Sequence, residues 1–134
     1  MKKTFTAILF ALLSLALSAQ PLQLIVSEDV PEAAREVLLQ RFTQMLENGG
    51  FSLTDEASAP VMIVSVEEKE RMETSGTAVV LDVTAEVKDV ATTFTVKGLG
   101  SDADDAYLRA AKQILPQSKA AKVFLSAVKM VVHE

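Results

Sequence analysis

The sequence has no cysteine and no tryptophan, and only one histidine and one tyrosine among its 134 residues. Without cysteine the chain forms no disulfide and offers no lipid-attachment cysteine. A zinc site needs several Cys or His ligands, so this composition argues against one. Catalysis by serine or cysteine needs an ordered histidine base, yet His133 lies one residue from the end of the sequence. The shortage of aromatic residues argues against a stacking surface for sugars or single-stranded nucleic acid.

The first twenty residues have the pattern of a secretory signal peptide. Two lysines precede an apolar run over residues 7–17, and small residues follow at Ser18 and Ala19. The run is shorter than the about 20 residues of a comfortable membrane span. We expect a signal peptide over residues 1–19, a single domain over residues 20–134, a periplasmic location and no stable membrane span after cleavage; an uncleaved anchor is the alternative.

The mature chain is acidic. Removal of Lys2 and Lys3 leaves eleven of the thirteen Lys and Arg residues against eighteen Asp and Glu residues, which gives a formal charge of −7. An acidic domain is a poor general binder of nucleic acid, so we expect none as a partner.

Apolar periodicity predicts the first half of the domain. A short apolar strand over 22–26 is followed by an amphipathic helix, in which apolar residues recur three and four apart. Gly49 and Gly50 end this helix. A short edge strand over 51–53 and a buried strand over 61–66 come next.

The region from 67 to 88 offers the candidate interaction surface. Residues 67–76 are polar, and they form either a mobile hairpin loop or the ends of two long strands. Residues 77–88 alternate between apolar and polar, which is typical of a strand with one face on the core and one in water. We expect a partner to contact the polar face or the charged segment, that is Asp82, Thr84, Glu86, Lys88, Glu67, Glu68 and Glu70.

A second strand, over 92–97, is expected to pair with it as a hairpin and to turn through Gly98 and Gly100 into an alanine-rich helix. We expect Ser101 to cap this helix, with Asp104 as the third residue of a capping box. Three aspartates at the helix start would repel a phosphate, so the two glycines do not indicate a nucleotide site. A last helix begins near residue 118.

The resulting order is strand, helix, short strand, three strands and two helices. It predicts an α+β domain with a mostly antiparallel sheet of about four strands and helices on one face.

Two segments resemble a small α+β domain of bacterial envelope assembly proteins. The first is an amphipathic helix followed by Glu-Asn-Gly-Gly-Phe-Ser-Leu-Thr-Asp (47–55) and Ala-Pro-Val-Met-Ile-Val-Ser-Val (59–66). The second is a hairpin that ends in Phe-Thr-Val-Lys-Gly-Leu-Gly-Ser (94–101) before an alanine-rich helix. Similar domains occur in penicillin-binding-protein activator lipoproteins, the curli secretion pore subunit, flagellar assembly protein T and the N-terminal domain of TolB. The resemblance implies a binding and assembly module; this chain differs in lacking a lipobox cysteine.

We therefore expect a non-catalytic domain that binds another envelope protein, with no catalytic residue, cofactor or metal. One alternative is a carboxylate-based hydrolase of envelope glycans, using Asp82 with Glu86 or the acids of residues 67–70. The other is a small-ligand or metal-binding module at the turn formed by residues 102–105.

Overall fold

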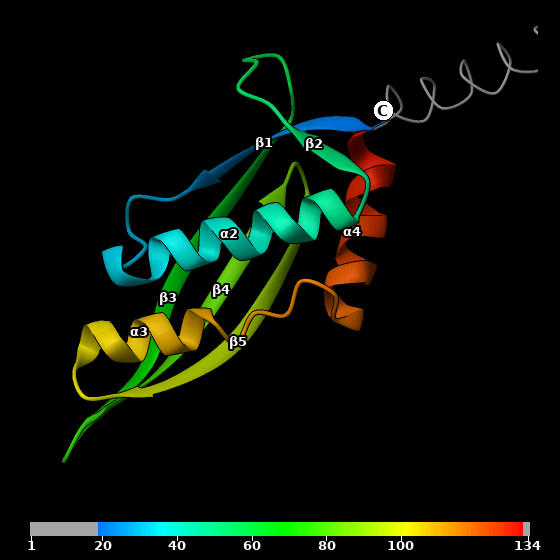
Figure 1. The fold of residues 1–134 in the computed structure, drawn as a ribbon. Helices are drawn as coiled ribbons and strands as arrows, with labels where there is room; N and C mark the ends of the chain where they lie inside the picture. Colours follow the sequence, from blue (N-terminus) through cyan, green and yellow to red (C-terminus); the bar gives the residue numbers. More distant parts are fainter. Residues whose placement is uncertain (1–18, 133–134) are drawn as a thin grey trace, which may run out of the picture.

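The computed structural model describes residues 19–132 (Figure 1). His133 and all but the last residue of the predicted signal peptide lie outside the described residues. The elements in chain order are β1 (Gln20–Val26), α2 (Glu32–Asn48), β2 (Phe51–Leu53), β3 (Val61–Glu73), β4 (Thr77–Val87), β5 (Val90–Gly100), α3 (Ala103–Ala111) and α4 (Lys119–Val132). The predicted α+β class and the predicted order of elements are confirmed.

The sheet has five strands in the order β2-β1-β3-β4-β5. The strands β3, β4 and β5 form an antiparallel meander, whereas β1 runs parallel to both of its neighbours, β2 and β3. The fifth strand is the short segment 51–53, which pairs with β1. The sheet is therefore mixed, with its two parallel pairs on one side.

The helices α2 and α3 cover one face of this sheet, and α4 stands across the end of α2 beside β5 (Figure 1). On the covered face the inward residues of β4 are almost fully buried. Phe42 of α2 meets Phe94 of β5 edge to face, with ring centroids 6.1 Å apart. Each fully buried large side chain contributes about 1.5–3 kcal/mol through removal from water. The other face of the sheet has no helix on it (Figure 1).

The charged segment after residue 66 is strand rather than loop, because β3 continues to Glu73 and its pairing with β4 extends to that residue. Of the two alternatives, the long paired strands are confirmed. The ladder is interrupted once: Glu68 lies opposite Leu81 and Glu70 opposite Val80, so Lys69 is an extra residue in a β-bulge.

Two glycines let α3 lie against β5. A Cβ at Gly98 would be 2.0 Å from the Ala106 carbonyl oxygen, and a Cβ at Gly100 would be 2.5 Å from the Ala106 nitrogen. Neither glycine has positive φ, so close approach of backbones is the reason for both. Gly98 and Gly100 lie in β5 itself and not in a turn after it.

The predicted helix cap is wrong by one residue. Gly100 is still paired with Thr77, so β5 extends three residues beyond the strand end expected at residue 97. Asp102, not Ser101, is the N-cap of α3, and its Oδ1 accepts from the Asp105 nitrogen at 2.8 Å. Asp105 takes the reciprocal role expected of Asp104, because its Oδ2 accepts from the Ser101 nitrogen at 3.1 Å.

Between residues 19 and 132, no helix has the length and apolar content needed to cross a membrane.

Candidate interaction surface

The uncovered face of the sheet brings together most of the polar residues that the sequence singled out. Asp82, Thr84 and Glu86 alternate with the buried side chains of β4 and therefore point to this face. By register, Asp82 lies between Glu67 of β3 and Thr95 of β5. We call this side of the sheet, as carried by β1, β3, β4 and β5, the open face.

Hydrogen bonds between neighbouring strands order the middle of the open face. The Thr95 hydroxyl donates to Asp82 Oδ1 at 2.7 Å. The Thr84 and Thr93 hydroxyls, which belong to directly opposed residues, lie 2.9 Å apart. Such cross-strand pairs fix side-chain directions, and the centre of the open face is consequently a polar and preorganised surface.

Large apolar side chains flank this polar centre at two corners. Ile25 and Ile63 are opposed on β1 and β3 and are each about half exposed. Met72 and Leu99, which lie on either side of Ala78 in β4, are 67% and 70% exposed. Sequence reasoning missed these four residues, because a single apolar side chain in a strand gives no sign of which face it occupies.

The charged residues of β3 do not share one face, contrary to their grouping in the sequence. Glu67 and Glu70 lie opposite Asp82 and Val80, so both belong to the open face. Glu68 lies opposite the buried Leu81 and points to the helix-covered side.

Lys88 also lies off the open face. It occupies the two-residue loop between Val87 and Val90, with φ at 54°. Its Nζ donates to the Val131 carbonyl oxygen of α4 at 2.9 Å. The expectation that β4 reaches Lys88 is therefore one residue too long, and this lysine ties the hairpin loop to α4.

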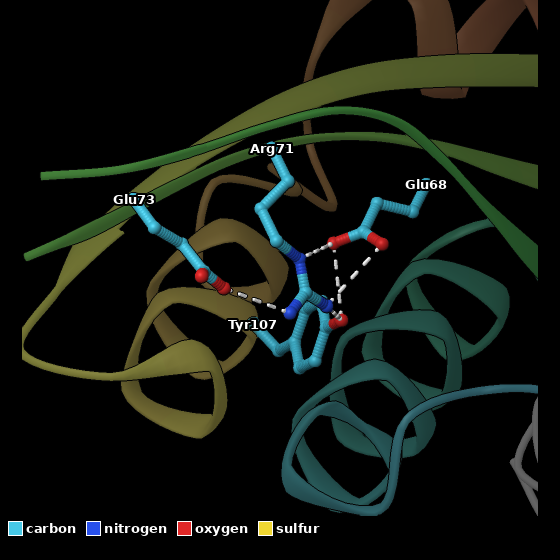
Figure 2. A network of polar contacts seen from close by, with 4 residues as sticks. All are labelled: Glu68, Arg71, Glu73 and Tyr107. Atoms are coloured by element: carbon cyan, nitrogen blue, oxygen red, sulfur yellow. Dashed lines mark hydrogen bonds and ion pairs between the residues drawn. The ribbon is translucent and has the colours of Figure 1, made fainter.

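On the helix-covered side, Glu68 joins Arg71, Glu73 and Tyr107 in a polar network (Figure 2). Arg71 Nε donates to Glu68 Oε1 at 2.9 Å, and its Nη1 donates to Glu73 Oε1 at 3.2 Å. Arg71 Nη2 donates to the Tyr107 hydroxyl, which itself donates to Glu68 Oε1 at 3.0 Å. The network therefore ties the far end of β3 to α3.

The contacts of the network determine its protonation. Hydrogen bonding to Glu68, then to Glu73, raises the pKa of the Arg71 guanidinium above its ordinary value. Burial raises the pKa of the Tyr107 hydroxyl, and its bond to Glu68 raises the pKa further. At neutral pH Arg71 is therefore a cation and Tyr107 a neutral phenol.

The carboxylates of the open face lack the arrangement of a glycosidase pair. Asp82 and Glu86 are four residues apart on one extended strand, which spans about 13 Å. Glycosidases place their two carboxyl groups about 5–9.5 Å apart. Glu67 is nearer to Asp82, but its side chain is 72% exposed, and a general acid needs a site sheltered from water.

The aspartates at the start of α3 are occupied by the chain itself. Asp102 and Asp105 accept from backbone N–H groups, and Asp105 Oδ1 also accepts from Arg109 Nε at 3.2 Å. The Ser101 N–H, then Arg109, lowers the pKa of the Asp105 carboxyl. Within residues 19–132, no three His, Cys, Asp or Glu side chains converge to hold a metal ion.

No protein-family model matches the sequence, and no curated protein matches it. Among solved structures, the chain is similar to a minor lipoprotein from Acinetobacter baumannii, with 13% identity, a TM-score of 0.43, and coverage of 85% of this chain and 93% of that one. It is also similar to a chain of the PelC dodecamer from Paraburkholderia phytofirmans, with 17% identity and a TM-score of 0.38. That match covers 81% of this chain and 79% of the PelC chain. At these values neither structure assigns this chain to a family.

Proposed function

We propose that the protein is a non-catalytic interaction domain, exported to the periplasm, that binds another protein of the bacterial envelope through the open face of its sheet. The observation that carries the proposal is the composition of that face. It has no helix on it, and it presents exposed apolar side chains at two corners around a hydrogen-bonded polar centre.

Surface composition supports binding rather than catalysis. The exposed apolar side chains form two pairs with a hydrogen-bonded polar region between them, so a partner would find apolar contact area on both sides of groups that can form hydrogen bonds. Met72 and Leu99 together with Ile25 and Ile63 supply apolar contact area, while the Asp82 and Thr84 pairs supply hydrogen-bonding groups of fixed direction. The periplasmic part of the proposal depends on the signal-peptide pattern of the first nineteen residues.

Site-specific photo-crosslinking tests the proposed surface. A photoreactive amino acid is placed at Thr84 or Thr93, on the open face, in the full chain expressed in a bacterium that exports it. We expect a crosslinked protein partner from both positions, because each lies at the centre of the proposed contact.

Gln40 gives the matched control, since it is exposed on α2, on the opposite side of the sheet. Crosslinking of the same partner from Gln40 with equal yield, or no crosslinked partner from Thr84 and Thr93, would contradict the proposal.

A further inference from the structure

The free edge of β5 lies beside a hollow that the open face does not account for. The hollow has a volume of about 750 Å³ and is lined by β4, by β5 and by the outer side of α3. Its β5 wall is Lys97, Gly98 and Leu99, and its α3 wall includes Leu108, Arg109 and Lys112. It lies at this edge because Gly98, which has no side chain, allows α3 to pack closely against the C-terminal part of β5.

Backbone hydrogen-bonding groups of β5 point toward this hollow. In an antiparallel pair, alternate residues bond to the neighbouring strand and the others direct their N–H and C=O groups away. A two-residue loop joins Val87 to Val90, which makes these two a bonded pair. Counting along the ladder, Thr95, Lys97 and Leu99 then direct their backbone groups outward, and in the described part of the chain none of them bonds to another element through its backbone.

The hollow is positively charged in an otherwise acidic molecule. It is lined by Lys97, Arg109 and Lys112 against the single carboxylate of Asp105. Arg109 pairs with that carboxylate at 3.2 Å. In residues 19–132, neither Lys97 nor Lys112 forms an ion pair within 4.0 Å, although the charge of Lys112 also acts on the Asp105 carboxyl. A single lysine on an edge strand commonly prevents edge-to-edge aggregation. That role does not explain a second lysine, on α3, at the same hollow.

We propose that this hollow binds an extended segment of a partner protein, in which pairs of acidic residues alternate with pairs of apolar residues, and that the segment adds to β5 as a sixth strand. Its backbone pairs with the outward groups of Thr95, Lys97 and Leu99. Successive residues of a strand point to opposite sides of the sheet, so one acid of a pair reaches Lys97 on the open side and the other reaches Lys112 on the α3 side. The apolar pair contacts Leu99 and Leu108 in the same way. This site adjoins the open face at Leu99, but strand addition uses the free edge of β5 and does not depend on the open-face contact.

The test uses a fluorescent peptide, acetyl-Asp-Glu-Val-Val-Asp-Glu-amide, and the full mature chain, with binding followed by fluorescence anisotropy. We expect saturable binding that weakens as salt is added. The double variant Lys97→Glu with Lys112→Glu should bind about tenfold more weakly, because two attractions become two repulsions. The matched control is Lys119→Glu with Lys122→Glu on α4, which changes the charge equally and should leave the affinity unchanged.

Strand addition is separated from simple charge attraction by a second peptide of identical charge, in which alternate backbone nitrogens are methylated. In one methylation register the methyl groups face β5, so that peptide cannot complete the ladder and should not bind measurably. In the other register the methyl groups face away from β5, so that peptide should still bind. Slower amide hydrogen exchange at Thr95, Lys97 and Leu99 in the complex would support the proposal. No saturable binding at millimolar peptide, equal binding by the double variant, or equal binding by both methylated peptides would overturn it.

Discussion

The side chains of Asp102 and Asp105 determine where α3 begins. Both carboxylates accept from backbone N–H groups that the first turn of a helix leaves without partners. The sequence pattern of a small polar residue followed by acids correctly predicts a cap in this segment. It does not identify which residue is the cap, because that depends on how far β5 remains paired with β4.

Replacement of Asp102 by alanine should therefore lower the free energy of unfolding by about 1 kcal/mol, the usual cost of removing an N-cap. Ser101→Ala is the matched variant, and it should change stability much less because the Ser101 side chain is not the cap. Urea denaturation of both variants measures the difference. Equal destabilisation by the two substitutions, or a larger effect of Ser101→Ala, would show that the cap is assigned to the wrong residue.

Tyr107 is the only tyrosine in the chain, so it reports on the polar network directly. Its pKa is raised above 10.0 by burial and by the bond to Glu68. A group whose pKa is higher in the folded state contributes stability below its unfolded pKa, and this contribution is lost as pH rises through the folded pKa. The protein should thus lose stability above pH 10, and Tyr107→Phe should remove that part of the loss.

Absorbance of the tyrosinate as a function of pH gives the measurement. The midpoint should lie above that of the same chain in denaturant, and Glu68→Gln should move it part of the way back. A native midpoint at or below the denatured one would contradict the described contacts of Tyr107.

Among the elements, β3 differs most from what its sequence indicates. In a regular strand, residues three apart point to opposite faces, so Glu68 and Arg71 could not bond. The bulge at Lys69 puts both on the helix-covered side, where they meet Tyr107. Alternation correctly predicted the faces of β4, which has a regular ladder. It could not predict those of β3, because an extra residue leaves no trace in the pattern of polar side chains.

Deletion of Lys69 should accordingly be tolerated. It removes the extra residue and leaves every other pair between β3 and β4 opposite its present partner, so the change in the free energy of unfolding should stay within about 1 kcal/mol. The matched control is deletion of Thr84 from β4, where no extra residue absorbs the loss. That deletion moves the side chains on one side of the deleted position to the opposite face of the sheet, so buried residues become exposed, and it should prevent folding. Circular dichroism and thermal unfolding compare the two, and loss of folding on deletion of Lys69 would contradict the assigned register.

At the scale of the whole molecule, apolar periodicity was enough to predict an α+β domain with helices on one face. Helix α2 buries one stripe and ends at the predicted glycines, and the inward residues of β4 form the centre of the core. The apolar corners of the open face and the hollow beside β5 could not be predicted in this way. Each combines residues from different strands or from a strand and a helix, and only the sheet order and register bring them together.

The position of β1 has a consequence for the order of assembly. The first strand of the described chain lies inside the sheet, between β2 and β3, which both come later in the sequence. The two hairpins of β3, β4 and β5 close over short loops, whereas β1 must wait for partners that begin at residues 51 and 61. Pairings between distant segments form slowly because the loop-closure entropy is lost before contacts are gained. When the chain is synthesised or exported with its N-terminus first, β1 is therefore the first strand available but among the last to join the sheet.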